Sequence, residues 1–148
     1  MIVFRRRVGG EEGSTLILVI FYGMLALILI LVVSAATSLY LERKRLFSLA
    51  DSAALVGAEA FDLSTVSLAD GVPSVELSSG DVHAAVEDFL DGHPSGKFEE
   101  LRLEQAVSVD GKSATVTLSS YWRPPVITAF VPDGIRLDVT SVARSVFG

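Results

Sequence analysis

The 148-residue chain contains no cysteine, which excludes disulfide bonds and metal sites built on thiolates. It contains two histidines, His83 and His93, and neither lies in a spacing typical of a metal motif. No phosphate-binding loop, dinucleotide fingerprint or Gly-x-Ser-x-Gly turn occurs. We therefore predict that the protein is not an enzyme, has no catalytic residues, and uses no cofactor and no metal.

One weak alternative concerns a helix predicted over residues 81–91. His83, Glu87 and Asp91 recur there at four-residue intervals, so their side chains share one helix face that could hold a metal ion. Exposed acidic residues are ordinary on helices, and we interpret this face as solvated.

Charge is missing from residues 13–41, and residues 16–36 are almost entirely apolar. About 20 apolar residues, at about 1.5 Å of rise each, cross a hydrocarbon layer of about 30 Å. The segment predicts a membrane-spanning helix surrounded by lipid. The competing interpretation is a secretory signal, because Arg5–Arg7 precede the segment and Ser34-Ala35-Ala36 provides small residues for cleavage. The apolar core of a signal peptide has only about 7 to 15 residues, so we favour the anchor and keep a domain released after Ala36 as the alternative.

Charge divides the chain unevenly. Residues 1–60 carry a net charge of +1, and residues 61–148 carry −7. An acidic domain repels phosphate groups, so nucleic acid is not an expected partner. By the positive-inside rule, Arg5–Arg7 and the amino terminus narrowly outweigh residues 43–45, which favours a cytoplasmic N-terminus.

The spanning helix is predicted to continue beyond the membrane, because no glycine or proline occurs from residue 37 to residue 56. A helix over residues 14–61 would be about 70 Å long. Its protruding half, residues 38–61, carries a set of small residues in place of Leu or Ile: Ala50, Ala53, Ala54, Gly57 and Ala58. Small faces allow close packing against a partner or the chain's own domain, while alanines also simply favour helix. Asp51 lies within this packing set, and its own side chain is expected to face water.

Residues 62–148 predict a small α+β domain. Residues 62–80 indicate a loop with a turn at residues 70–73 and a short strand at residues 75–77. Ser79 or Asp81 is expected to cap the helix over residues 81–91, whose apolar face comprises Val82, Val86, Phe89 and Leu90.

Alternating apolar residues on both sides of Asp110-Gly111 predict a tight hairpin. A two-residue turn pairs Val107 with Ala114 and Leu103 with Leu118, without a slip in register. A third strand begins at residue 135, and we expect antiparallel strands backed by the short helix and the protruding half of the long one. Trp122 ends the second strand, where a partner contact and core packing are both open.

Two segments resemble one family. Residues 13–19, Gly-Ser-Thr-Leu-Ile-Leu-Val, resemble the processing site of type IV pilin-like proteins, in which a membrane peptidase cuts after the glycine, here between Gly13 and Ser14. Residues 46–58, Leu-Phe-Ser-Leu-Ala-Asp-Ser-Ala-Ala-Leu-Val-Gly-Ala, closely resemble the hallmark that follows the membrane helix of TadE/TadG-like Flp pilus-assembly proteins.

The resemblance implies a pilin-like α+β fold and the role of a minor pilin-like component, or pseudopilin, that supports assembly of a Tad/Flp pilus. It implies a single-pass membrane location, an extracytoplasmic C-terminal domain, and three kinds of protein partner: other pilin-like subunits, the Tad secretion machinery and a prepilin peptidase. The implied divisions are a leader at 1–13, a span at 14–37, a protruding helix at 38–61 and a domain at 62–148. The alternative is a single-pass protein whose outer domain binds a ligand or partner.

One position departs from the family pattern. Pilins usually carry a glutamate at the fifth residue after the cut, and counting from Ser14 places Leu18 there. In the family that carboxylate neutralises the amino terminus of a neighbouring subunit within the membrane, where an unpaired charge costs several kcal/mol. Leu18 cannot do so, which implies that the chain is not a repeating subunit, occupies a special position such as the tip, or stays uncut.

Overall fold

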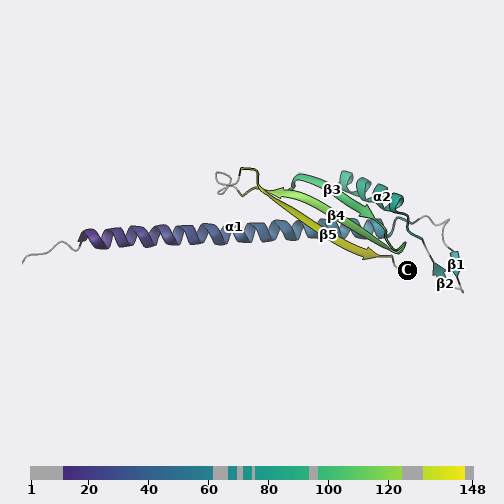
Figure 1. Ribbon diagram of the computed structural model, residues 1–148, viewed down its shortest axis with the longest axis horizontal. Coiled ribbons are helices and arrows are strands. Elements are labelled where there is room, and N and C mark those ends of the chain that lie inside the picture. The colour runs from purple at the N-terminus through teal and green to yellow at the C-terminus, as the bar shows by residue number, and fades with distance from the viewer. Residues whose placement is uncertain are drawn as a thin grey trace, which may run out of the picture. The chain divides into compact units, whose positions relative to one another are not determined.

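The computed structural model describes residues 12–61, 67–69, 72–74, 76–93, 97–124 and 132–145. The chain forms two compact units, Met1–Thr37 and Ser38–Gly148. One helix, α1 (Glu12–Ala58), is continuous and contributes residues to both units (Figure 1). The predicted long helix is therefore confirmed, with its end at Ala58 rather than residue 61.

The first unit is the apolar part of α1. Among the described residues, α1 is the one helix long and apolar enough to cross a membrane. Its large apolar side chains from Leu16 to Val33 are exposed around the whole circumference of the helix. A helix that is apolar on every face belongs in hydrocarbon rather than in water, which fits membrane anchoring.

The second unit is built on an antiparallel sheet of three strands in the order β3-β4-β5. The strands are β3 (Glu99–Val107), β4 (Ser113–Trp122) and β5 (Ile135–Arg144), and Figure 1 shows them beside the second half of α1 and beside α2 (Ser79–Gly92). The α+β fold expected from the sequence is confirmed.

Alternation along β4 and β5 buries one face of this sheet. Every second residue of β4 from Ala114 to Trp122 is buried, and so is every second residue of β5 from Leu137 to Ala143. The β4–β5 pairing is regular along all ten residues of each strand, so these positions lie opposite one another across the ladder. Their common face forms the sheet side of the core.

The helix side of the core is made of small residues. Leu46, Ala50, Ala53, Ala54 and Ala58 are fully or almost fully buried. Their spacing of three and four residues places them on one side of α1, the arrangement of a helix that packs through a single stripe. Only Leu46 among them is large, so the helix side of the core consists mainly of alanine methyl groups.

Helix α2 confirms most of its predicted pattern. Val82 and Val86 are buried, while Phe89 and Leu90 are half-buried. The predicted capping residue was wrong, because the N-cap is Ser78, whose Oγ accepts a hydrogen bond from the Gly80 backbone N–H at 3.2 Å. The serine that precedes α2 by one position therefore satisfies a free N–H of the first turn.

Ser79 has a different role from capping. Its Oγ donates to the carbonyl of Ser108 and accepts from the Ser108 N–H, both at 3.0 Å. These bonds tie the start of α2 to the segment that follows β3. The neighbouring Ser78 is then the side chain left to cap the helix.

The register of the hairpin differs from the predicted one near its turn. Leu103 pairs with Leu118, as predicted, but Val107 pairs with Thr115 instead of Ala114. The prediction of an unslipped register was therefore wrong at the turn end of the hairpin and right near its middle.

The turn explains the slip. Asp110 Oδ1 accepts hydrogen bonds from the backbone N–H groups of Lys112 and Ser113, at 2.9 and 2.7 Å, and from Ser113 Oγ at 2.8 Å. An aspartate that binds the backbone two and three residues ahead builds a wider turn than a two-residue loop. Gly111, at φ 68°, supplies the left-handed conformation within it.

A bulge in β3 then restores the register. The ladder shifts between Leu103 and Gln105, which leaves Glu104 without a residue opposite it. Because of the shift, Ala106 is buried in the core, and Val107 is only half-buried.

A small hairpin lies within the segment predicted as a loop. Strand β1 (Ser67–Ala69) pairs with β2 (Val72–Ser74) in an antiparallel register. The strand predicted at residues 75–77 is wrong at Glu76 and Leu77, which lie in no strand. Val75 and the turn residues Asp70 and Gly71 lie outside the described residues.

Candidate interaction surfaces

The predicted processing residues lie at the start of α1. Gly13 and Ser14 have helical backbone in its first turn. Leu18, at the position of the absent glutamate, is exposed on the first unit. From Thr15 to Ala36 the described helix carries no Asp, Glu, Lys or Arg, so no other side chain of this stretch offers a carboxylate in place of Leu18.

The small residues of α1 are covered by the chain's own second unit. A Cβ added at Gly57 would lie 3.1 Å from a Val82 methyl, 3.2 Å from the Ala114 Cβ and 3.2 Å from a Val86 methyl. Helix α1 therefore meets α2 and β4 at Gly57 in a contact so close that an added carbon would require its neighbours to shift by a few tenths of an ångström. The stripe that includes Ala50, Ala53, Ala54 and Ala58 is occupied by this intramolecular packing.

Asp51 is exposed beside that buried stripe. Its Oδ1 accepts a hydrogen bond of 3.0 Å from Ser141 Oγ on β5. Ser141 itself is buried, so the carboxylate satisfies a hydroxyl that water reaches poorly. Asp51 thus links the solvent side of α1 to the sheet.

Trp122 lies in the interior of the second unit. Its side chain is 8% exposed, and its indole Nε1–H donates to Ser38 Oγ at 3.3 Å. A buried indole usually finds an acceptor for its N–H, and Ser38 supplies one at the start of the unit. Little of the ring is left at the surface for a partner.

An exposed face of α1 was missed by the sequence reasoning. Tyr40, Arg43, Lys44 and Phe47 follow the spacing i, i+3, i+4 and i+7, so they share one side of the helix. Tyr40 is 66% exposed and Phe47 is 49% exposed. The same spacing was visible in the sequence, but the predicted helix gave no means of telling its covered side from its free side.

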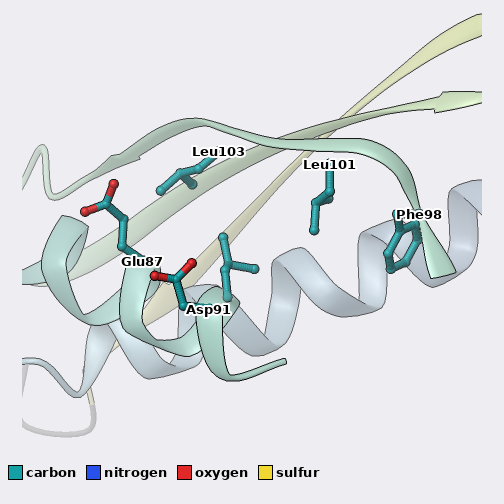
Figure 2. Close-up of a pocket in the computed structure, with 6 residues that line it drawn as sticks. Glu87, Asp91, Phe98, Leu101 and Leu103 are labelled. Atoms are coloured by element: carbon teal, nitrogen blue, oxygen red, sulfur yellow. The ribbon is translucent and has the colours of Figure 1, made fainter. Parts of the chain in front are cut away.

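A groove lies between α2 and β3, with a volume of about 280 Å³ (Figure 2). Its apolar lining comes from both elements: Leu90 on α2, Leu101 and Leu103 on β3, and Phe98 just before β3. Glu87 and Asp91 of α2 complete the lining with two carboxylates. The groove is therefore apolar at its base and acidic at its rim.

Two residues of this groove, Glu87 and Asp91, also belong to the helix face that the sequence suggested could hold a metal ion together with His83. His83 Nδ1 lies 3.4 Å from Glu87 Oε2, and both side chains are at least half exposed. Among the described residues, no group of three or more His, Asp or Glu side chains is arranged to hold a metal ion.

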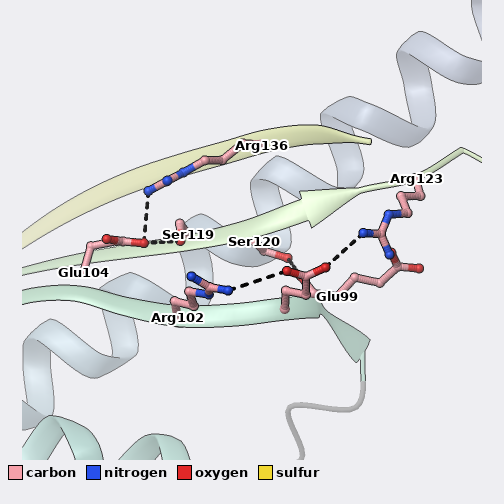
Figure 3. A network of polar contacts seen from close by, with 8 residues as sticks. Glu99, Arg102, Glu104, Ser119, Ser120, Arg123 and Arg136 are labelled. Carbon is pink, nitrogen blue, oxygen red and sulfur yellow. Dashed lines mark hydrogen bonds and ion pairs between the residues drawn. The ribbon is translucent and has the colours of Figure 1, made fainter. Parts of the chain in front are cut away.

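The outer face of the sheet carries a network of polar contacts (Figure 3). The bulge in β3 directs Glu104 toward this face, where its Oε1 accepts from Ser119 Oγ at 2.6 Å and from Arg136 at 3.0 Å. Arg136 also lies 3.0 Å from Asp138, and this contact, together with Glu104, raises the pKa of the arginine above its ordinary value.

A second part of the network lies at the start of β3. Arg123 contacts Glu99 at 3.1 Å and Glu100 at 2.9 Å, and Arg102 lies 3.7 Å from Glu100. Cations and carboxylates are thus matched across the three strands. Such exposed pairs fix side-chain positions and add little stability individually.

These features define the class of protein: one candidate membrane-spanning helix whose continuation packs, through small residues, against a small antiparallel sheet. Residues 13–69 match the family model Tad, described as "Putative Flp pilus-assembly TadE/G-like". The resemblance to TadE/TadG-like proteins is confirmed over those residues, which make up less than half of the chain. Searches of curated proteins and of solved structures found no match.

Proposed function

We propose that the chain is a membrane-anchored, minor pilin-like component that supports assembly of a Tad/Flp pilus. The observation that carries the proposal is the match of residues 13–69 to the TadE/G-like family, which extends from the candidate membrane helix into the second unit. The family suggests a structural, non-enzymatic role. The burial of Leu46, Ala50, Ala53, Ala54 and Ala58 supports that role, because it makes the second half of α1 a packed structural element of the second unit.

The proposed organisation is a leader at 1–13, a span at 14–37, a protruding helix at 38–61 and an extracytoplasmic domain at 62–148, with the N-terminus in the cytoplasm. A prepilin peptidase would cut between Gly13 and Ser14. The other partners would be membrane lipid, pilin-like subunits and the Tad secretion machinery. Leu18 supports a minor position, because the span lacks the carboxylate that would pair with a neighbour's amino terminus.

The mature N-terminus tests the processing step. The full chain is extracted from membranes of a strain with the Tad machinery, and its intact mass is measured. Loss of residues 1–13 is expected, and a Gly13→Leu variant should keep them. Loss of residues 1–36 would instead identify a secreted domain, and no loss would identify a plain membrane anchor.

A deletion strain tests the role itself. We expect fewer surface pili by electron microscopy and recovery when the intact gene is supplied on a plasmid. Normal piliation in the deletion strain would reject the proposed function and favour a single-pass protein that binds a ligand or partner independently of the pilus.

A further inference from the structure

We propose that copies of this chain associate head to tail through their second units. The exposed face of α1 formed by Tyr40, Arg43, Lys44 and Phe47, here named the cationic face, docks into the groove between α2 and β3 of the next copy. This contact deepens the proposed function, on which it rests for holding the copies side by side at one membrane. It joins soluble units and does not depend on the carboxylate that Leu18 replaces.

The cationic face combines exposed aromatic rings with unpaired charges. Tyr40 and Phe47 are 66% and 49% exposed, and they flank Arg43 and Lys44 on the same side of α1. Within the described residues neither cation forms an ion pair, whereas Arg45 lies 3.7 Å from Glu42. Two unpaired cations between two exposed aromatic rings thus lie on an otherwise acidic unit, and aromatic residues and arginine are enriched at protein interfaces.

The groove has the complementary composition. Its base is formed by Leu90, Phe98, Leu101 and Leu103, and the carboxylates of Glu87 and Asp91 lie one helical turn apart at its rim. A cavity of about 150 Å³ accommodates benzene, so a groove of about 280 Å³ has room for one phenyl ring. An aromatic ring with cations beside it would fill the base and neutralise the rim.

Both surfaces extend along a helix. Tyr40 and Phe47 are two helical turns apart, about 10 Å along α1, with both cations between them. Glu87 and Asp91 are separated by about 6 Å along α2 and lie on both sides of Leu90 in the sequence. Helices that place side chains into a groove of another protein are a recurrent mode of recognition, and here Tyr40 and Phe47 are the residues that can serve as anchors.

Charge decides between a head-to-tail contact and a symmetric one. A contact between two cationic faces would bring Arg43 and Lys44 against their own copies, and a contact between two grooves would bring four carboxylates together. Like charges disfavour both arrangements. The contact is therefore heterologous, and a pair of copies retains one free groove and one free cationic face between them.

Lipid headgroups are the rival occupant of the cationic face. Tyrosine and basic residues gather at membrane interfaces, which would account for Tyr40, Arg43 and Lys44. The half-exposed ring of Phe47 calls for apolar cover instead, and the groove supplies it. Lipid binding to the cationic face also gives no reason for the apolar side chains and carboxylates that line the groove.

The absence of cysteine makes the contact directly testable by crosslinking. Full-length Ser48→Cys, next to the cationic face, and full-length Ala84→Cys, on α2 near the groove, carry different tags and are reconstituted together in phosphatidylcholine vesicles. Both positions are exposed. A short bismaleimide should give a mixed 48–84 product about tenfold above the background from a Val142→Cys and Ala84→Cys pair, which places one thiol on the outer sheet face.

Charge reversal supplies the matched control. Arg43→Glu with Lys44→Glu in the first partner should lower the 48–84 product about tenfold, and so should Glu87→Lys with Asp91→Lys in the second. Combining the two reversed partners should restore it, which a misfolded variant cannot do.

Three outcomes would overturn the proposal: a 48–84 product at background level, a product indifferent to charge reversal, or a dominant 48–48 product. Binding of the chain to anionic vesicles together with a background-level product would identify lipid as the occupant. Each outcome leaves the proposed function to be judged separately, from the mature N-terminus and from piliation of the deletion strain.

Discussion

Ser141 on β5 donates a hydrogen bond from Oγ to Asp51 Oδ1 on α1, across 3.0 Å. The donor is buried and the acceptor belongs to an exposed side chain. If the bond is broken, Asp51 can form a hydrogen bond with water instead, whereas the buried hydroxyl of Ser141 cannot.

The first prediction follows from that asymmetry. Asp51→Ala leaves the buried hydroxyl of Ser141 without its acceptor and should lower the free energy of unfolding by about 1–3 kcal/mol. Ser141→Ala removes both the donor and its demand for a partner, so its cost should be smaller, near 1 kcal/mol or less. Urea unfolding of the full chain in detergent measures both. An equal loss in the two variants would contradict the argument, and Ser52→Ala, on the exposed side of α1, is the control.

The second prediction concerns Gly57. In Gly57→Ala the new methyl would press against Val82, Val86 and Ala114 at once. We expect overpacking of about 1–3 kcal/mol to exceed the gain of about 1 kcal/mol in helix propensity, so the variant should be less stable. Gly92→Ala on α2, where the added carbon meets nothing within 4 Å, should be neutral or stabilising. Thermal unfolding compares the two, and a Gly57→Ala variant as stable as Gly92→Ala would refute the close contact.

The third prediction uses the only tryptophan of the chain as a probe. Because Trp122 is 8% exposed, its fluorescence should peak at short wavelength and resist acrylamide until the unit unfolds. Trp122→Ala should cost about 3–5 kcal/mol through the cavity it leaves. Val109→Ala, at a position that is 85% exposed, should cost almost nothing. Strong acrylamide quenching of the folded protein would show that the ring lies at the surface.

The fourth prediction concerns pH. Hydrogen bonds from the Lys112 N–H and from the Ser113 hydroxyl and N–H lower the pKa of Asp110 from 3.8 to about 2. Because the folded pKa lies below the unfolded one, Asp110 contributes stability that is fully present above about pH 4 and is lost as the pH falls toward 2.

Two measurements check this pH dependence. A carboxyl NMR titration of Asp110 should report the lowered pKa directly. Unfolding of Asp110→Asn should be less sensitive to pH between 4 and 2 than unfolding of the original chain. A titration midpoint for Asp110 near 4 would mean that its turn does not form in solution.

Helices and strands that are indicated by many residues at once were predicted well from the sequence. The apolar run of α1, the absence of glycine and proline from residue 37 to residue 56, and the alternation in β4 and β5 each involve many residues that indicate the same element. A few ambiguous positions do not change such an assignment. The third strand and the helix after residue 80 were recognised for the same reason.

Features that depend on one or two side chains were harder to predict. The choice of Ser78 over Ser79 as the cap rests on which serine bonds to Ser108, a contact 29 residues away. The hairpin slip rests on Asp110 binding Ser113, and a bulge at Glu104 compensates for it. Rules for turns consider only neighbouring residues and favour the two-residue loop. They cannot predict that a bulge at Glu104 restores the register.

The interaction surfaces were only partly predictable. The small residues of α1 indicated close packing, but whether their partner was another chain or the chain's own sheet depended on tertiary structure. The groove between α2 and β3 joins Leu90 to Leu103, which no spacing within one helix or strand brings together. The cationic face required knowledge of which side of α1 the sheet covers.

The alanine layer between α1 and the sheet has a thermodynamic consequence. Unfolding exposes little apolar surface from each of the four alanines in this layer, Ala50, Ala53, Ala54 and Ala58. The interface therefore adds little to the heat capacity change of unfolding. A small heat capacity change flattens the curve of the free energy of unfolding against temperature. The free energy of unfolding then decreases less when the protein is cooled. The soluble unit should therefore tolerate low temperature better than a domain of equal size built on leucine.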